Sequence, residues 1–289
     1  MKPKKNQFYV GCSGWSYSAW QGPFYPSNLD SSRWLNYYSN IFDYVEIDSS
    51  FYKIPNIFTV KNWSKKTPDS FRFSAKFPKV ITHDKRLKDV SRELEYFFQA
   101  MLPLQDKTIA LLLQLPPSLK ITEGLESLRQ LVPDLNSRFR YAVEVRHKSW
   151  FSDLAYNFFA NNNLCLVWNQ LADIQTPPIA TTDFMYIRFI GDRSISEEDF
   201  GRIQKDRTGE MYKWANKIKA IQKEDKSSTH QVKLAIVSAN NHYAGFGPAT
   251  ANLFRKMINL PLVSWEDNKL TQETTSNSKQ ESLSEFMSV

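Results

Sequence analysis

Eight short runs of β-forming residues recur along this chain of 289 residues, and helical patterns separate nearly all of them. Most of the runs are rich in Val, Ile, Phe, Tyr or Leu and end in polar or turn residues. Regular alternation of strands and helices is typical of an α/β fold with a parallel sheet, and eight units favour a closed (β/α)8 TIM-type barrel over an open sheet. The predicted strands are residues 7–14, 44–50, 71–78, 109–116, 141–146, 164–169, 184–191 and 231–240.

The connections between these strands carry cap and turn signals. Ser31 and Ser32 are predicted to cap the helix after the first strand, and Ser152 to cap the helix after the fifth. Pro248 suits the first turn of the last helix. The sixth connection, 170–183, is short and contains two adjacent prolines, which predicts that it lacks a full helix.

The chain length predicts a single domain followed by a tail. A barrel of this type takes about 250 residues, which fits one domain over 1–265. Residues 266–289 are rich in Ser, Thr, Gln and Lys, and we expect them to be disordered. The two cysteines, Cys12 and Cys165, give neither a disulfide framework nor a metal-ligand spacing. No apolar leader or spanning segment is evident, so we expect a cytoplasmic protein with no membrane association.

Charged residues occur within the predicted strands, and a period of two assigns each of them to a face of the sheet. In the second strand Val45 and Ile47 share one face, and Glu46 and Asp48 share the other. The same period predicts that charged side chains of other strands also point into the barrel. Burying a charge there costs free energy unless the charge is paired. The inward set contains three acids and three bases, which are Glu46, Asp48, Glu144, Lys76, Arg146 and Arg188.

These charges lie near the C-terminal ends of the strands, where barrel enzymes carry their active sites. We therefore expect an enzyme that binds a small phosphorylated or carboxylated metabolite. The sequence does not indicate which class of reaction it catalyses. Glu144 or Glu46 is the predicted general base and His83 the candidate general acid. The expected substrate-binding residues are Ser13, Trp15, Tyr17, Asp48, Ser50, Tyr52, Lys76, Gln114, Arg146, His147, Trp150, Asn169, Arg188 and Asn240.

The inward charges have a second interpretation, as a structural ion-pair network that plugs the barrel. Such a plug pairs every cation with an acid. A binding site instead leaves one guanidinium, that of Arg188 or Arg146, facing open space. The aromatic residues that follow the strands also have two interpretations. Their rings could stack on a sugar or a nucleobase, or they could pack the loops of the barrel.

Motifs for metal, nucleotide or serine-based chemistry are missing from the sequence. It contains no HExxH pair, no G-x-S-x-G elbow and no Gly-rich phosphate loop. We therefore predict neither a cofactor nor a bound metal, with a single divalent ion on Glu46, Asp48 and Glu144 as the alternative. His147 and His242 follow predicted strands, so they can reach the barrel mouth.

Positive charge is concentrated in one part of the chain, which has a net charge of +7. Residues 61–88 contain nine Lys or Arg and only two acids. This pattern fits a solvated surface, and it also fits a partner such as nucleic acid. Nucleic-acid binding or processing, in the manner of barrel-type endonucleases, is therefore the second functional hypothesis. Steep salt dependence distinguishes it from a buried site for a small ligand.

Seven short motifs follow one another along the chain: 11–17 (GCSGWSY), 45–52 (VEIDSSFY), 71–76 (FRFSAK), 114–117 (QLPP), 143–151 (VEVRHKSWF), 186–188 (YIR) and 240–242 (NNH). They resemble the YecE-like family, also called domain of unknown function 72, and they keep the family's order through about 250 residues. The resemblance implies a barrel of the triosephosphate-isomerase type, and it supplies no reaction. The family usually has Asn at the position of Asp48, and often Asp at the position of Asn169.

Overall fold

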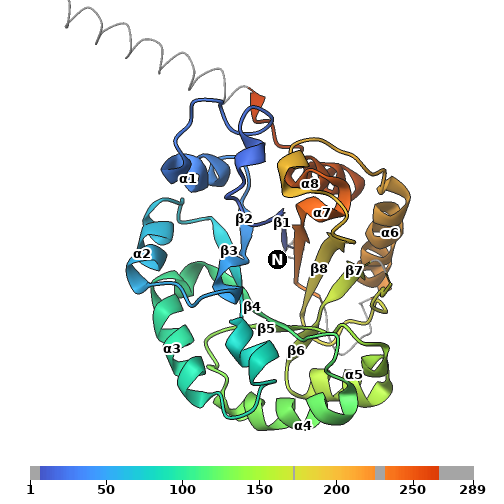
Figure 1. Cartoon of the computed structure of the whole chain (residues 1–289). Coiled ribbons are helices and arrows are strands. Elements are labelled where there is room, and N and C mark those ends of the chain that lie inside the picture. The colour runs from blue at the N-terminus through green and yellow to red at the C-terminus, as the bar shows by residue number, and fades with distance from the viewer. Residues whose placement is uncertain (1–6, 172, 225–231, 267–289) are drawn as a thin grey trace, which may run out of the picture.

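The strands of the computed structural model form one parallel sheet that curls into a nearly closed barrel (Figure 1). The structure describes residues 7–171, 173–224 and 232–266. The order of strands around the sheet is β6-β5-β4-β3-β2-β1-β9-β8-β7. The strands are β1 (Gln7–Ser13), β2 (Tyr44–Ile47), β3 (Arg72–Lys76), β4 (Thr108–Gln114), β5 (Tyr141–Glu144), β6 (Leu164–Leu166), β7 (Trp168–Leu171), β8 (Phe184–Gly191) and β9 (Leu234–Ala239).

The predicted sixth strand is present as two short strands, β6 and β7, with Val167 between them. The first pairs with β5 and the second with β8, so one continuous run passes from one neighbour to the other. The backbone N–H of Val167 donates to the carbonyl of Val143 at 3.0 Å, which keeps the run beside β5 at the break. This run therefore brings the two ends of the sheet together, and the predicted α/β barrel of a single domain is confirmed.

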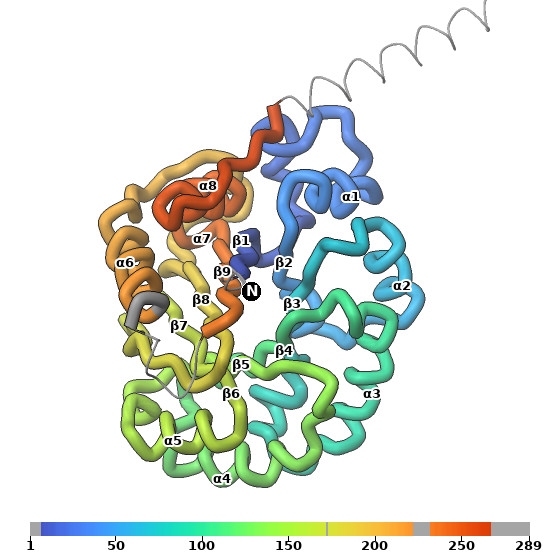
Figure 2. Tube along the Cα trace, turned by 180° about the vertical axis from the view of Figure 1, so that it is seen from behind, coloured from blue at the N-terminus to red at the C-terminus, as the bar shows by residue number. Residues whose placement is uncertain are grey.

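Helices surround the barrel on its outer face, as both views show (Figures 1 and 2). In α3 and α4 the buried residues recur at intervals of three and four, so each helix turns one apolar stripe toward the strands. The helices are α1 (Trp34–Ser39), α2 (Ile57–Lys65), α3 (Ser91–Met101), α4 (Ile121–Leu131), α5 (Asp153–Asn161), α6 (Thr208–Glu224), α7 (Asn241–Ala244) and α8 (Gly247–Met257).

The caps follow the sequence at two of three helix starts. Ser152 caps α5, since its hydroxyl accepts from the N–H of Ala155 at 3.4 Å, and Pro248 lies in the first turn of α8. The prediction for Ser31 and Ser32 is wrong, because both belong to a short 3-10 turn ahead of α1. The carboxylate of Asp30 caps that turn instead. The connection 170–183 contains no helix among its described residues.

The interior of the barrel is apolar toward the N-terminal ends of the strands and becomes polar toward their C-terminal ends. A cluster of hydroxyl groups marks the change, where the Tyr44 hydroxyl lies 2.6 Å from Ser74 Oγ and 2.9 Å from both Tyr186 Oη and Ser238 Oγ. Below and around it lies a separate apolar cluster, made of Tyr9, Tyr44, Ile109, Ala110, Leu112, Ala142, Cys165, Val167, Phe184, Tyr186, Leu234 and Ile236. The charged side chains nearer the C-terminal ends of the strands therefore pack against a filled apolar core.

Two further features concern the limits of the chain and of its helices. Among the described residues, none of the helices combines the length and the apolar character needed to cross a membrane. The polar tail predicted over 266–289 lies outside the described residues, apart from Glu266.

Candidate functional site

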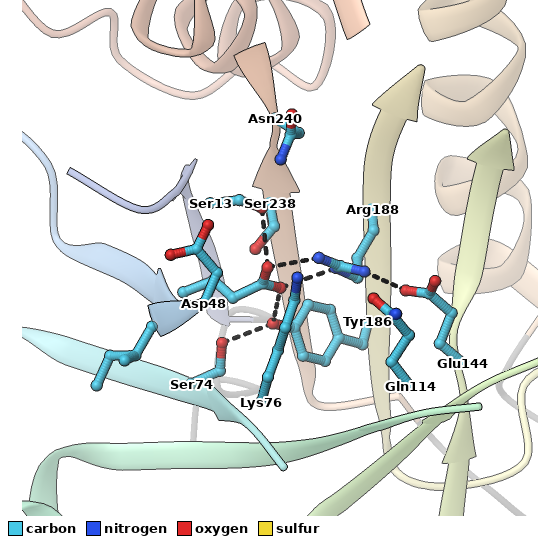
Figure 3. A network of polar contacts seen from close by, with 12 residues as sticks. Ser13, Asp48, Ser74, Lys76, Gln114, Glu144, Tyr186, Arg188, Ser238 and Asn240 are labelled. Carbon is cyan, nitrogen blue, oxygen red and sulfur yellow. Dashed lines mark hydrogen bonds and ion pairs between the residues drawn. The ribbon is translucent and has the colours of Figure 1, made fainter. Parts of the chain in front are cut away.

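The strand register sets the charged side chains at one level of the barrel. Ser13 is paired with Glu46 across β1 and β2, Gln114 with Glu144 across β4 and β5, and Asn169 with Arg188 across β7 and β8. Ser13, Gln114 and Glu144 are the last residues of their strands. The structure thus brings together the predicted charges of strands that are far apart in sequence (Figure 3).

Arg188 is the centre of this layer and is almost completely buried, with 1% of its side chain exposed. Its Nε donates to Glu46 Oε2 at 2.8 Å and its Nη2 to Glu46 Oε1 at 2.6 Å. Its Nη1 donates to Glu144. Tyr186 and Ser13 also donate to Glu46, at 2.6 Å and 2.9 Å. Of the two guanidinium groups expected as the free one, Arg188 or Arg146, that of Arg188 is engaged, because all three of its nitrogens bind carboxylates.

Arg146 has a different position, at the border between the charged layer and open space. Its Nε donates to Glu144 Oε1 at 2.5 Å and its Nη2 to Gln114 Oε1 at 3.0 Å. The part of the chain that the structure describes provides no hydrogen-bond partner for its Nη1. Of the two guanidinium groups in this layer, that of Arg146 is the one with a nitrogen not engaged by the described residues, and 13% of its side chain is exposed.

The two buried glutamates are held as anions. Burial alone would raise the pKa of Glu144, but Arg146 and Arg188 outweigh it and lower that pKa to about 2. Burial also opposes ionisation of Glu46, and Arg188 with Lys76 lowers its pKa below the ordinary value. A lowered pKa makes a carboxylate a weaker base near neutral pH.

A cavity of about 210 Å³ lies above this layer, at the mouth of the barrel. Lys76 reaches it from the end of β3, and Asp48 reaches it from the turn after β2. Burial and the neighbouring Arg188 lower the pKa of Lys76, whereas burial raises the pKa of Asp48 despite the charge of Lys76. The cavity is lined by Tyr17, Asp48, Tyr52, Lys76, Arg146, Arg188, Ile190, Arg193, Glu197, Phe200, Asn240 and His242.

The predicted site residues fall into three groups. Tyr17, Asp48, Tyr52, Lys76, Arg146, Arg188 and Asn240 line the cavity. Ser13, Glu46, Gln114 and Glu144 form the hydrogen-bonded layer with Arg188 and Arg146. The remaining predicted residues, Trp15, Ser50, His83, His147, Trp150 and Asn169, are outside the cavity wall.

Trp150 and His147 lie away from the cavity because the chain turns back after β5. Trp150 is completely buried, donates to the Leu119 carbonyl at 2.8 Å and stacks on Phe159. His147 caps the short turn that leads to Trp150, where its Nδ1 accepts from the N–H of Ser149. Both residues position the connection between β5 and α5.

Four other predicted residues also make structural contacts. Trp15 packs edge-on against Trp63, with ring centroids 5.5 Å apart. Asn169 is buried, and its side chain accepts from Thr176 at 2.6 Å. The Ser50 hydroxyl donates to the Lys76 carbonyl at 2.8 Å. His83 packs edge-on against Phe51, with ring centroids 4.9 Å apart.

The strand pattern did not indicate one part of the cavity wall. Arg193, Glu197 and Phe200 come from the segment after β8. Phe200 is packed between Tyr17 and His242, with ring centroids 5.8 Å and 4.9 Å away. Their position just after the C-terminal end of a barrel strand is the only signal that could have found them.

The carboxylates of the site are spread among cations and do not gather by themselves. Within 7–171, 173–224 and 232–266, no three His, Cys, Asp or Glu side chains are grouped so that they could hold a metal ion. Glu46 and Glu144 instead flank the guanidinium of Arg188.

The basic segment 61–88 is divided among several environments. Lys76 is at the cavity, and Arg72 is at the opposite end of β3, where it donates to the carbonyl of Asp69. The cations after Lys76 are paired with acids: Lys79 with Asp84, Lys85 with Glu93, and both Arg86 and Lys88 with Glu123.

Comparisons with known proteins agree with this architecture. YecE of Escherichia coli strain K12, described as a UPF0759 protein, is 32% identical over 144 residues, which make up 50% of this chain and 50% of that protein. The match thus spans about half the length of that relative. The crystal structure of a DUF72 family protein from Thermotoga maritima MSB8 has a TM-score of 0.72 and 28% identity, and the match covers 88% of this chain and 99% of that one.

A second solved structure shows the same fold. It is a DUF72 family protein from Enterococcus faecalis V583, with a TM-score of 0.70 and 21% identity, matched over 90% of this chain and all of that one (100%). A family model also matches residues 9–275, and so extends past the predicted domain boundary at 265. The chain therefore belongs to the family described as protein of unknown function DUF72.

Proposed function

We propose that the cavity at the barrel mouth binds a small metabolite with a carboxylate or phosphate group, and that the protein is an enzyme acting on it. One observation carries this proposal. The acids that neutralise Arg188 lie beneath the cavity, while Lys76 and the Nη1 of Arg146 have no such partner among the described residues and line the cavity wall. Unused cationic donors in a partly desolvated site favour an anion.

The size of the cavity supports a small ligand. Pockets for drug-sized molecules typically hold about 300–1,000 Å³. The volume here is about 210 Å³, so a ligand of a few carbon atoms with one anionic group suits it better than a larger molecule. Tyr17 and Phe200 supply aromatic surface beside the charged groups, as small-molecule sites commonly do.

The acid–base role is better suited to Asp48 than to the glutamates. Arg188 and Arg146 hold Glu46 and Glu144 as weakly basic anions, whereas Asp48 lines the cavity and has a raised pKa. A carboxyl group whose pKa moves toward neutrality transfers protons more effectively in both directions. We therefore assign the general acid and base role to Asp48 within this proposal.

The alternative of a nucleic-acid partner has weaker support. The basic segment that suggested it is divided between the cavity, the far end of β3 and surface ion pairs. Phosphate-backbone binding needs several cations on one face and gives steep salt dependence. Tight binding of a short DNA duplex that weakens by orders of magnitude between low and physiological salt would favour this alternative.

The test is thermal unfolding in the presence of sulfate or phosphate, with KCl at the same ionic strength as the reference. A ligand that binds only the folded state stabilises it by about 2.7 kcal/mol at a hundred times its Kd. Arg146→Gln and Lys76→Met should each remove most of this gain. Lys79→Met is the matched control, because Lys79 is exposed and paired with Asp84 outside the cavity, and it should keep the full gain.

Arg188 is unsuitable as the test variant. Removing it leaves the buried Glu46 with hydroxyl partners only and Glu144 with Arg146 alone. Breaking a buried ion pair in this way typically costs about 3–5 kcal/mol, so any loss of binding would be confounded with unfolding. If sulfate and phosphate leave the unfolding temperature of the wild-type protein unchanged at millimolar concentration, the charged layer is a structural plug and the enzyme assignment fails.

A further inference from the structure

We propose that Lys76 is a nucleophile that forms an imine with the carbonyl carbon of a small 2-oxo acid. This inference deepens the proposed function and rests on it, because the carboxylate of the 2-oxo acid would occupy the anion site beside Arg146. The carbonyl group would then lie within the same cavity as Lys76 and Asp48.

The backbone of Lys76 is held firmly at the C-terminal end of β3. The N–H of the next residue, Phe77, donates to the Leu112 carbonyl at 2.9 Å, and the Ser50 hydroxyl donates to the Lys76 carbonyl at 2.8 Å. The ammonium group lies 5.9 Å from the centre of the Phe51 ring. These contacts fix the backbone from which the side chain starts, and the side chain lines the cavity. Figure 3 shows it beside Asp48 and Arg188.

The ammonium of Lys76 is partly buried and lacks the partners that hold the fully buried cations of this protein. Lys107 shows the structural pattern, since its Nζ donates to the carbonyls of Ser64 and Thr67 at 2.9 Å and 2.8 Å. Arg188 binds two carboxylates. Within the described residues Lys76 has neither a hydrogen bond nor an ion pair at Nζ, which leaves its lone pair, once deprotonated, open to an electrophile.

The surroundings of Lys76 favour the neutral amine, which is the nucleophilic form. Burial and the charge of Arg188 on β8 lower the pKa of Lys76. The carboxylates of Glu46, Asp48 and Glu144 act in the opposite direction without cancelling these effects. A lysine that is desolvated beside another cation is one of the standard ways to activate an amine.

The reaction balances without a further reagent. Asp48 takes a proton from the Lys76 ammonium, and the nitrogen lone pair attacks the carbonyl carbon, which forms a C–N bond while the carbonyl electron pair moves to oxygen. That oxygen gains two protons in turn, one through Asp48 and one from the nitrogen. The C–O bond then breaks, and water leaves. The products are a protonated imine and water, so the positive charge of Lys76 is conserved.

The test is reductive trapping of the full-length protein with pyruvate and sodium borohydride, followed by peptide mass mapping. The expected result is one reduced pyruvate unit on Lys76, formed saturably and suppressed by sulfate. Acetone is the matched probe, because it has a methyl group in place of the carboxylate. Loss of one charge-assisted hydrogen bond predicts labelling at least about tenfold weaker with acetone at equal concentration.

Two variants separate this inference from the proposed function. Lys76→Arg cannot form an imine, so it should lose the adduct. Lys79→Arg should retain both the adduct and the stabilisation by sulfate. If wild-type Lys76 is unmodified while sulfate still stabilises the protein, the imine inference is overturned and the anion site stands. If sulfate has no effect and Lys76 is also unmodified, both proposals fail.

Discussion

At the scale of single residues, the notable arrangement is a pair of completely buried carboxylates held by one guanidinium. Arg188 binds Glu46 through Nε and Nη2 and binds Glu144 through Nη1. Buried ion pairs of this kind add little net stability compared with apolar packing, but they are costly to break. The network therefore fixes which cations are engaged and which, such as Lys76, have no bonded acid among the described residues.

The first prediction concerns Glu144 and acid. Its folded pKa of about 2 lies below its unfolded value of about 4.3, so the unfolded state binds more protons between these two pH values. The ion pairs of Glu144 then contribute about 3 kcal/mol above pH 5, and this contribution is lost as pH falls toward 2. Urea unfolding at several pH values should show a smaller acid-induced loss in Glu144→Gln than in wild type.

The control for this titration is Glu126→Gln, which removes an exposed carboxylate of α4. It should leave the pH dependence close to that of wild type, because exposed ion pairs contribute little. A free-energy difference between Glu144→Gln and wild type that stays constant from pH 6 to pH 3 would contradict the assignment of a lowered pKa.

At the scale of elements, the close approach of β1 and β2 sets the position of Glu46. The Tyr38 hydroxyl is inserted between these strands, where it accepts from the N–H of Cys12 at 2.8 Å and donates to the Tyr44 carbonyl at 2.9 Å. Gly11 provides the space for this contact. A Cβ at Gly11 would lie 2.0 Å from the Tyr44 carbonyl oxygen, which is a backbone atom that cannot move alone.

The second prediction follows from this contact. Gly11→Ala should lower the free energy of unfolding by about 3 kcal/mol or more, because β1 and β2 must separate to admit the methyl group. Gly209→Ala is the matched control at the start of α6, where a Cβ meets no atom within 4 Å. It should be neutral or stabilise the protein by up to about 1 kcal/mol through helix propensity. Equal effects of the two variants in urea unfolding would refute this explanation.

At the scale of the whole molecule, the beginning and the end of the described chain are joined. β1 pairs with both β2 and β9, and this pairing places the first and last strands side by side (Figure 1). Outside the barrel, the indole of Trp265 donates to the Pro23 carbonyl at 3.1 Å and packs against Phe24 and Phe246. The contacts of Trp265 with Pro23 and Phe24 connect segments more than two hundred residues apart.

The third prediction tests this connection. Trp265→Ala should lower the free energy of unfolding by about 2 kcal/mol, roughly half of the cost for a fully buried aromatic ring, because Trp265 is only half-buried. Leu262→Ala changes a 58% exposed side chain of the same segment and should be nearly neutral. Trp265→Phe should have an intermediate effect, since it keeps the ring contacts and loses the hydrogen bond. A thermal unfolding series in which Leu262→Ala is as damaging as Trp265→Ala would contradict the proposed connection.

The sequence determined the fold class and the level of the charged layer by itself. Alternating strand and helix patterns predict a parallel barrel, and the two-residue period of a strand decides which side chains point inward. Glu46, Glu144 and Arg188 could therefore be identified as inward charges before any contact was known. These features depend on backbone geometry that is local along the chain.

Only the tertiary structure decided which of these charges are paired. The partners of Arg188 lie 142 and 44 residues away, so no local pattern shows that it is fully engaged while Lys76 is not. Trp150 turns into the core, and Phe200 joins the cavity wall, for the same reason. Side-chain direction beyond a strand end depends on the packing of loops against distant elements, and that packing forms only when the barrel closes.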